Sequence, residues 1–230
     1  MPNPIDYTQI DYSQWTRRQI VFRDFVLLLI RLLARVQVEG AENIPATAPF
    51  VLAPNHIHML DLPVIFAYLP RRTVVFAADK WQKNPLFDRL LSFFGDAIYV
   101  HRGAPDRKAL GLAVDVLKAG GVLGLAPEGT RSRTGGLQQG RTGVVYLANR
   151  GCVPILPVVA FGQEKAFACW LRLRRVPITV RFGPLVQLPP GKYRTPDLDA
   201  HTDLLMMALA RMLPPQYRGV YADRFAGEGE

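Results

Sequence analysis

A histidine and an aspartate, separated by four residues, form the first group that could carry out acid–base chemistry. They are His56 and Asp61 in the segment Asn55-His56-Ile57-His58-Met59-Leu60-Asp61. A neutral imidazole can accept a proton from a substrate hydroxyl near pH 7, and a carboxylate on its other nitrogen stabilises the imidazolium that forms. No nucleophile accompanies the pair, so the attacking group would be the hydroxyl of the substrate. The alternative is that both are ordinary polar loop residues and that Asp61 caps a helix.

The residues on either side indicate where this pair lies. The apolar run Phe50-Val51-Leu52-Ala53 ends in Pro54, which is typical of a buried strand, and Asp61 followed by Pro63 is typical of a helix start. On a continuous helix, His56 and Asp61 would lie about 140° apart, so they can meet only if the chain turns between them. We therefore predict a strand-to-helix loop, the place where open α/β sheets usually bind ligands.

A second loop combines residues that are suited to bind an anion. The apolar run 122–125 leads into Glu128-Gly129-Thr130-Arg131-Ser132. A glycine lets backbone amides approach an anion, a hydroxyl donates a hydrogen bond, and an arginine makes paired charge-assisted bonds to phosphate. The pattern predicts a phosphate site beside the histidine loop. A solvated basic turn is the alternative.

Two further segments could contribute to a site. One is the run 95–102, which reads as a strand ending in Arg102, and the other is the apolar strand 153–158, in which Pro154 and Pro157 could line an apolar slot. Each of them alone is more typical of an ordinary core strand. Their order along the chain, after the histidine loop and on both sides of the Glu-Gly-Thr-Arg loop, is what makes them candidates.

Short apolar runs alternate with stretches of helical length through most of the chain. Strands are predicted over 50–53, 73–77, 97–100, 122–125, 155–160 and 178–182, and helices over 84–94, 106–119, 142–150 and 197–213. Such alternation indicates an α/β fold with a mostly parallel central sheet flanked by helices. The absence of a low-complexity linker indicates one globular domain over residues 41–225.

The segment from Trp15 to Val36 is predicted to be an N-terminal amphipathic helix. Arg17, Asp24, Arg31 and Arg35 recur at intervals of seven, seven and four, while apolar residues cover most of the remaining surface. A helix of this kind could lie in a membrane interface or could pack on the core of the protein, and the pattern leaves both open. Because basic residues flank the apolar surface, we assign residues 1–40 to an N-terminal membrane-association helix as the prediction to be tested.

The composition limits the classes of partner. The 230 residues include 28 Lys and Arg against 19 Asp and Glu, a formal charge of +9, which favours an anionic partner such as nucleic acid, lipid or a phosphorylated substrate. Cys152 and Cys169 lack the spacing of a disulfide framework or a zinc site, so no metal site is predicted. The apolar stretch 25–36 is too short to span a bilayer and no signal-peptide pattern is present, so we do not expect an integral membrane protein.

The order of these segments, from about Asn55 to Val158, resembles the 1-acylglycerol-3-phosphate acyltransferases of the glycerolipid acyltransferase family. Asn-His-x-x-x-x-Asp and Glu-Gly-Thr-Arg-Ser both match in full. The resemblance implies His56 as the general base and Asp61 as its orienting partner. It also implies an acceptor-phosphate site formed by Arg102, Glu128, Gly129, Thr130 and Arg131. The apolar strand with Pro154 and Pro157 is the candidate acyl pocket.

The resemblance further implies the substrates and the setting. The expected reaction moves a fatty acyl group from a thioester donor, on coenzyme A or acyl carrier protein, to the free hydroxyl of lysophosphatidic acid, giving phosphatidic acid. The thioester is a co-substrate, and no cofactor is expected. The acceptor is a lysophospholipid at a membrane surface, so we expect a peripheral protein on the cytoplasmic face of the membrane.

The sequence also allows other acceptors and other functions. The acceptor could be a different lysolipid, such as a lyso-aminolipid, or the chain could be a non-enzymatic basic binder of membranes or nucleic acid. The absence of a recognisable nucleic-acid module argues against a nucleic-acid partner. Residues 135–142 have the spacing of a Walker A motif, but Arg141 replaces its lysine and no strand precedes it. His58 and His101 are expected to be structural rather than metal ligands.

Overall fold

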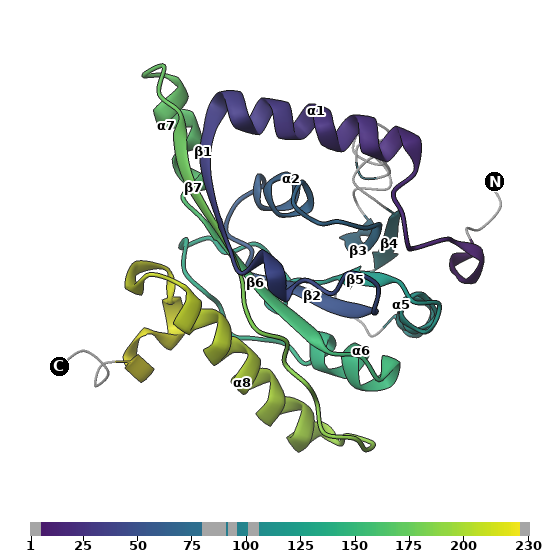
Figure 1. Cartoon of the computed structure of the whole chain (residues 1–230). Coiled ribbons are helices and arrows are strands. Elements are labelled where there is room, and N and C mark those ends of the chain that lie inside the picture. Colours follow the sequence, from purple (N-terminus) through teal and green to yellow (C-terminus); the bar gives the residue numbers. More distant parts are fainter. Residues whose placement is uncertain (1–5, 80–90, 92–95, 101–105, 226–230) are drawn as a thin grey trace.

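A central sheet organises the computed structural model, which describes residues 6–79, 91, 96–100 and 106–225 (Figure 1). The sheet has seven strands in the order β1-β7-β6-β2-β5-β3-β4. The strands are β1 (Ala34–Glu39), β2 (Phe50–Pro54), β3 (Thr73–Ala78), β4 (Asp96–Val100), β5 (Val122–Gly124), β6 (Ile155–Phe161) and β7 (Val176–Phe182). Every strand predicted from the sequence is therefore present.

The sheet is mostly parallel, as predicted. Strands β6, β2, β5, β3 and β4 run in one direction, whereas β7 is antiparallel to β6 and parallel to β1. The central strand β2 is buried on both faces, because Phe50, Val51, Leu52 and Ala53 are all inaccessible to solvent. Burial on both faces explains why this strand is a continuous apolar run without alternation.

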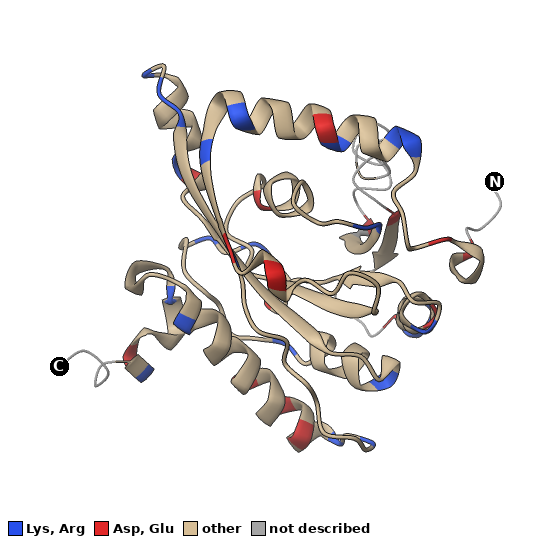
Figure 2. Cartoon of the chain, viewed as in Figure 1, with Lys and Arg blue, Asp and Glu red and all other residues tan. Residues whose placement is uncertain are grey.

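Helices cover both faces of the sheet (Figure 1). One face carries α1 (Arg17–Leu33) and α2 (Asp61–Phe66), and the other carries α5 (Arg107–Lys118), α6 (Gly143–Gly151) and α8 (Thr195–Met212). A short helix, α7 (Ala166–Trp170), lies between β6 and β7. Single turns of 3₁₀ helix are η1 (Tyr7–Gln9), η2 (Ala41–Asn43), η3 (Gln163–Lys165) and η4 (Pro215–Tyr217), and η5 (Gly219–Phe225) is longer. Figure 2 shows basic residues on the helices and turns around the sheet, including the turn that follows α7.

The predicted N-terminal helix is confirmed in its first part and wrong at its C-terminal end. Helix α1 begins after a capping box formed by Thr16 and Gln19 and ends at Leu33. The next six residues, Ala34–Glu39, form β1, which pairs with β7 along its whole length. β-Branched residues alternate with polar ones in this segment, and pairing with a neighbouring strand prevails over the helical continuation of the apolar pattern. The chain division at residue 40 stays a prediction, although β1 on its N-terminal side is a strand of this sheet.

The other predicted helices are found at nearly the expected positions. Helices α5, α6 and α8 match the predicted segments 106–119, 142–150 and 197–213 to within two residues at each end. The predicted helix 84–94 lies largely outside the described residues, and so do His101 and Arg102. None of the helices in the described part of the chain combines the length and apolar content that crossing a bilayer would need.

Candidate active site

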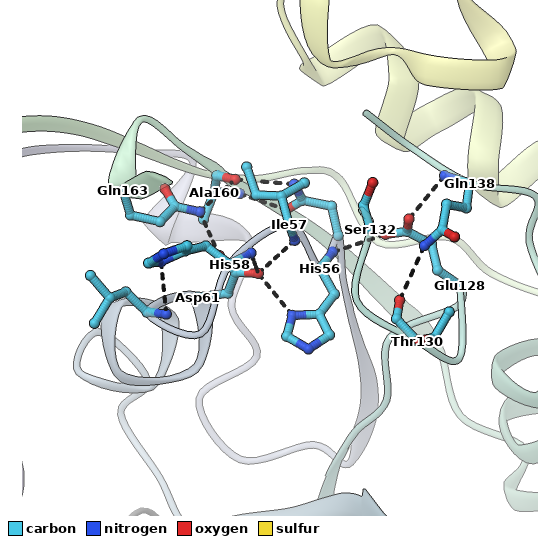
Figure 3. A network of polar contacts seen from close by, with 12 residues as sticks. His56, Ile57, His58, Asp61, Glu128, Thr130, Ser132, Gln138, Ala160 and Gln163 are labelled. Atoms are coloured by element: carbon cyan, nitrogen blue, oxygen red, sulfur yellow. Dashed lines mark hydrogen bonds and ion pairs between the residues drawn. The ribbon is translucent and has the colours of Figure 1, made fainter. Parts of the chain in front are cut away.

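His56 and Asp61 form a hydrogen-bonded pair in the loop between β2 and α2 (Figure 3). The distance from His56 Nδ1 to Asp61 Oδ2 is 2.8 Å. The same carboxylate oxygen accepts hydrogen bonds from the backbone amides of Ile57 at 2.7 Å and His58 at 2.9 Å. The loop therefore turns back on the first residue of α2, as the proposed pairing requires.

The exposure of the two side chains suits a base and its partner. The Asp61 side chain is 4% exposed, whereas the His56 side chain is 35% exposed. A neutral imidazole that donates from Nδ1 to this carboxylate has its lone pair on Nε2. Nε2 makes no hydrogen bond to any of the described residues, so it can accept a proton from a molecule in solution.

Gln163 holds the second oxygen of the aspartate. Its side chain is completely buried, and Nε2 donates to Asp61 Oδ1 at 2.6 Å and to the carbonyl oxygen of Ala160 at 3.1 Å. Gln163 begins η3, just past the end of β6 at Phe161, so it lies at the end of a strand adjacent to β2. The sequence analysis missed this residue, because no motif includes it. The available signal was a polar residue just past the end of a strand expected to be buried.

Asn55 ties the histidine loop to the same strand end. Its side chain is buried, Nδ2 donates to the carbonyl oxygen of Ala160 at 3.0 Å, and Oδ1 accepts from the amide of Ala160 at 2.8 Å. The Asn55 side chain thus bonds both backbone groups of Ala160, beyond the β2–β6 pairing that ends at Pro54 and Val158. The position of His56 is therefore fixed on the side of β6.

Glu128 fixes the histidine loop on the side of β5. Its carboxylate is buried, Oε1 accepts from the amide of His56 at 2.9 Å, and Oε2 accepts from the amide of Gln138 at 2.9 Å. The amide of Ser132 also donates to the carbonyl oxygen of His56 at 2.7 Å. Burial raises the pKa of Glu128, and the hydrogen bonds from Gln138 and His56 partly offset this effect. The carboxylate thus joins the two predicted loops, and its role in an acceptor site stays a prediction.

The rest of the Glu-Gly-Thr-Arg loop forms the exposed rim of the site. Gly129 has φ +68°, and a Cβ atom there would lie 2.9 Å from Cδ of Arg141. The loop therefore needs glycine where the Arg141 side chain crosses it. Arg131 and Arg141 are exposed, and Thr130 is half-buried. The structure brings guanidinium groups to the loop beside the dyad, and Arg141 is one that the sequence analysis considered only as a replacement for the Walker lysine.

The two prolines of the predicted acyl pocket lie at different positions relative to β6: Pro157 is inside the strand and Pro154 directly precedes it. Pro157 pairs with Ala53 near the end of β2 that leads to His56, and its side chain is buried. Pro154 precedes β6, and its carbonyl oxygen accepts from the amide of Val51 at 3.0 Å, near the start of β2. The structure therefore brings Pro157 toward the dyad but not Pro154, and an acyl pocket at either residue stays a prediction.

Comparison with known proteins identifies the family. The acyltransferase family model matches residues 35–160, which include the dyad and the Glu-Gly-Thr-Arg loop. This chain belongs to the acyltransferase family. Of the acyltransferase site residues predicted from the sequence, Arg102 lies outside the described part of the structure. Within that part, no three His, Cys, Asp or Glu side chains are grouped as a metal site would need.

Several acyltransferases resemble the chain in sequence. It is 30% identical over 163 residues to a 1-acyl-sn-glycerol-3-phosphate acyltransferase of Cocos nucifera, covering 65% of this chain and 49% of that protein. It is 32% identical over 144 residues to the alpha form of Mus musculus, covering 58% of this chain and 48% of the mouse protein. The chain thus spans about half the length of these curated relatives. The alpha form of Bos taurus is 28% identical over 222 residues, covering 89% of this chain and 74% of the bovine protein.

A solved structure confirms the acyltransferase fold. The 1-acyl-sn-glycerophosphate (LPA) acyltransferase PlsC of Thermotoga maritima superposes with a TM-score of 0.63 at 22% sequence identity. The match covers 84% of this chain and 79% of the Thermotoga maritima chain. The mostly parallel sheet flanked by helices is therefore the arrangement that the two proteins share.

Proposed function

We propose that this chain is a 1-acylglycerol-3-phosphate acyltransferase, which moves a fatty acyl group from a thioester to the free hydroxyl of lysophosphatidic acid. The observation that carries the proposal is the 2.8 Å contact between His56 Nδ1 and Asp61 Oδ2. It leaves Nε2 available beside a loop that carries Arg131. The names of the related acyltransferases support the same reaction.

In the proposed reaction His56 acts as a general base and no acyl-enzyme forms. Nε2 accepts the proton of the acceptor hydroxyl while the hydroxyl oxygen attacks the thioester carbonyl carbon. Asp61 stabilises the positive charge that develops on the imidazole ring. When the tetrahedral intermediate collapses, the carbon–sulfur bond breaks and the imidazolium returns the proton to the thiolate. The products are phosphatidic acid and the free thiol of the donor.

The acceptor phosphate is assigned to the rim of the Glu-Gly-Thr-Arg loop. Arg131 is exposed there and can make paired hydrogen bonds to phosphate oxygens. Glu128 supports the loop from inside, because both of its oxygens accept backbone amides. We further propose coenzyme A or acyl carrier protein as the carrier of the acyl group, no cofactor, and a peripheral location on the cytoplasmic face of the membrane that holds the acceptor.

The test is transfer of a labelled acyl group from acyl-coenzyme A, and separately from acyl carrier protein, to lysophosphatidic acid. Wild type should form phosphatidic acid with at least one donor, and His56→Ala should lose the activity while keeping the melting temperature of wild type. His58→Ala is the matched control, because His58 lies in the same loop and its side chain accepts a hydrogen bond from the backbone amide of Leu60, at 3.3 Å. Full activity of His56→Ala would contradict the mechanism.

Two further arms separate the alternatives. If the protein acylates a lysolipid without phosphate but not lysophosphatidic acid, the proposed acceptor is wrong and the proposed reaction, acyl transfer from a thioester, stands. If no donor and acceptor give transfer and the protein binds nucleic acid tightly at physiological ionic strength, the function is that of a non-enzymatic basic binding protein instead.

A further inference from the structure

Helix α1 has apolar side chains on the face that is turned away from the sheet. Its inward face packs on the core through residues such as Val26. The outward face exposes more than half of each of four apolar side chains, which recur at intervals of four, three and four along the helix: Val21, Phe25, Leu28 and Leu32. This spacing places them in one stripe. A helix that only covers a core needs one apolar face, and α1 has two.

The turn after α7, which we call the α7 turn (residues 171–175), exposes two leucines. Leu171 is 71% exposed and Leu173 is 98% exposed. The amide of Arg174 donates to the carbonyl oxygen of Cys169 at 2.9 Å, and the amide of Leu173 donates to that of Trp170 at 2.9 Å. These are the bonds of a Schellman motif, which favours glycine at the residue with positive φ. Here that residue is Leu173, with φ 51°, so folding does not explain the choice of leucine.

The α7 turn and α1 adjoin at one edge of the molecule (Figure 1). The indole nitrogen of Trp170 donates to the carbonyl oxygen of Leu33, the last residue of α1, at 3.0 Å. Phe167, on α7, is also largely exposed. The outward stripe of α1 and the leucines of the α7 turn therefore belong to neighbouring elements that a hydrogen bond joins.

Arginines surround these apolar side chains. Arg172, Arg174 and Arg175 alternate with or follow the two leucines of the α7 turn, and Arg17 and Arg18 lie at the start of α1 (Figure 2). All five are exposed, and none has an ion-pair partner among the described residues. A shallow hollow on α1 is lined by Arg17, Arg18 and the apolar side chains of Val21, Phe22 and Phe25. Leucines between unpaired arginines fit a surface that is apolar inside and anionic at its boundary.

We propose that α1 and the α7 turn form one docking surface for an anionic lipid bilayer. Leu171 and Leu173 enter the acyl-chain region, and Arg172, Arg174 and Arg175 bind the lipid phosphates. The inference rests on the proposed function in one respect, that the acceptor is a lipid in a membrane. The docking surface lies one helix away from the dyad, because α2, which begins at Asp61, shares its core cluster with α1.

The first test measures co-sedimentation of the full chain with vesicles of phosphatidylglycerol and phosphatidylcholine in equal parts. The double variant Leu171→Gln/Leu173→Asn removes the apolar side chains, and asparagine tolerates the positive φ at position 173. Its partition coefficient should fall about tenfold or more, since full burial of one leucine is worth a factor of that order. The matched control is Leu204→Gln/Val220→Asn, which changes two apolar residues on α8 and η5 that are also more than half exposed, and it should bind like wild type.

The second test removes charge instead of apolar surface. Arg172→Gln/Arg174→Gln/Arg175→Gln should weaken binding to the anionic vesicles about tenfold or more and should hardly change binding to pure phosphatidylcholine, because each basic residue near an anionic surface contributes about fivefold. The control is Arg107→Gln/Lys108→Gln/Lys118→Gln, which makes the same change of net charge on α5. An equal loss in both triple variants would contradict the proposal, since it would indicate attraction by net charge alone.

Further outcomes separate this inference from the proposed function. The proposal that a bilayer occupies this surface would be wrong if the leucine variant bound vesicles as tightly as wild type. It would also be wrong if wild type formed a stable dimer that the leucine variant disrupts. Transfer to a short-chain, water-soluble acceptor without vesicles should be the same in wild type and in the leucine variant. If wild type transfers the acyl group to no acceptor, with or without vesicles, but binds vesicles through the α7 turn, the enzyme proposal fails and the docking surface stands.

Discussion

Gln163 Nε2 donates a hydrogen bond of 2.6 Å to Oδ1 of Asp61 across 102 positions of the chain. The other oxygen of the same carboxylate holds His56, so the imidazole is oriented from the end of β6 as well as from its own loop. Its side-chain amide nitrogen donates to Asp61 and to the carbonyl oxygen of Ala160, and it acts on the imidazole through the aspartate. It is a positioning residue, and its contribution should appear in the rate of the chemical step.

Replacing Gln163 by methionine should lower kcat about tenfold to a hundredfold and leave KM nearly unchanged. A hydrogen bond to a charged group is worth about 1.5–3 kcal/mol, and each 1.4 kcal/mol corresponds to a factor of ten. Steady-state acyl transfer to lysophosphatidic acid measures both constants. Thr202→Val is the matched control, since Thr202 is also buried and its hydroxyl lacks a partner among the described residues. An unchanged kcat, or a raised KM alone, in folded Gln163→Met would argue against positioning.

The sequence predicts the chemical pair and both loops, because the residues that build them are local. His56 and Asp61 lie within one segment, and the order of the strands brings the Glu-Gly-Thr-Arg loop to the same edge of the sheet. No short motif singles out Gln163, since its contact depends on a tertiary pairing, and its place just past a buried strand is the one local signal. The start of strand Ala34–Glu39 was predicted as helix for a related reason. Its apolar residues continue the pattern of α1, and only the pairing with β7 makes the segment a strand.

Arg131→Ala should raise KM for lysophosphatidic acid about tenfold or more, because a paired hydrogen bond between guanidinium and phosphate would be lost. Transfer to an acceptor without phosphate, such as a monoacylglycerol, should change little. Arg133→Ala is the control, since Arg133 is an exposed arginine of the same turn. The same loss with both acceptors, or the same loss in Arg133→Ala, would speak against a phosphate contact at Arg131.

The stability of wild type relative to Glu128→Gln should rise as the pH falls. Burial raises the pKa of Glu128 above its ordinary value of 4.5, so the folded state binds the proton more tightly than the unfolded state does. The stabilisation from this proton is fully present below pH 4.5 and is lost as the pH rises through the raised pKa. Urea unfolding of both proteins at several pH values between 4 and 7 measures the difference. A difference that is constant, or that shrinks on acidification, would contradict the direction of the shift.

Leu173→Gly should separate stability from membrane binding. Glycine adopts the positive φ of position 173 without strain, so the free energy of unfolding should rise by about 0.5–1 kcal/mol. Vesicle binding should fall, because the most exposed leucine of the α7 turn is removed. Leu171→Gly is the informative counterpart: Leu171 has φ −58°, so glycine there should lower the free energy of unfolding by a similar amount while vesicle binding falls in the same way. Opposite changes in stability with the same loss of binding would mean that leucine at position 173 is kept for the surface it presents and not for the fold. Vesicle binding that follows stability in the two variants would instead assign both leucines to folding.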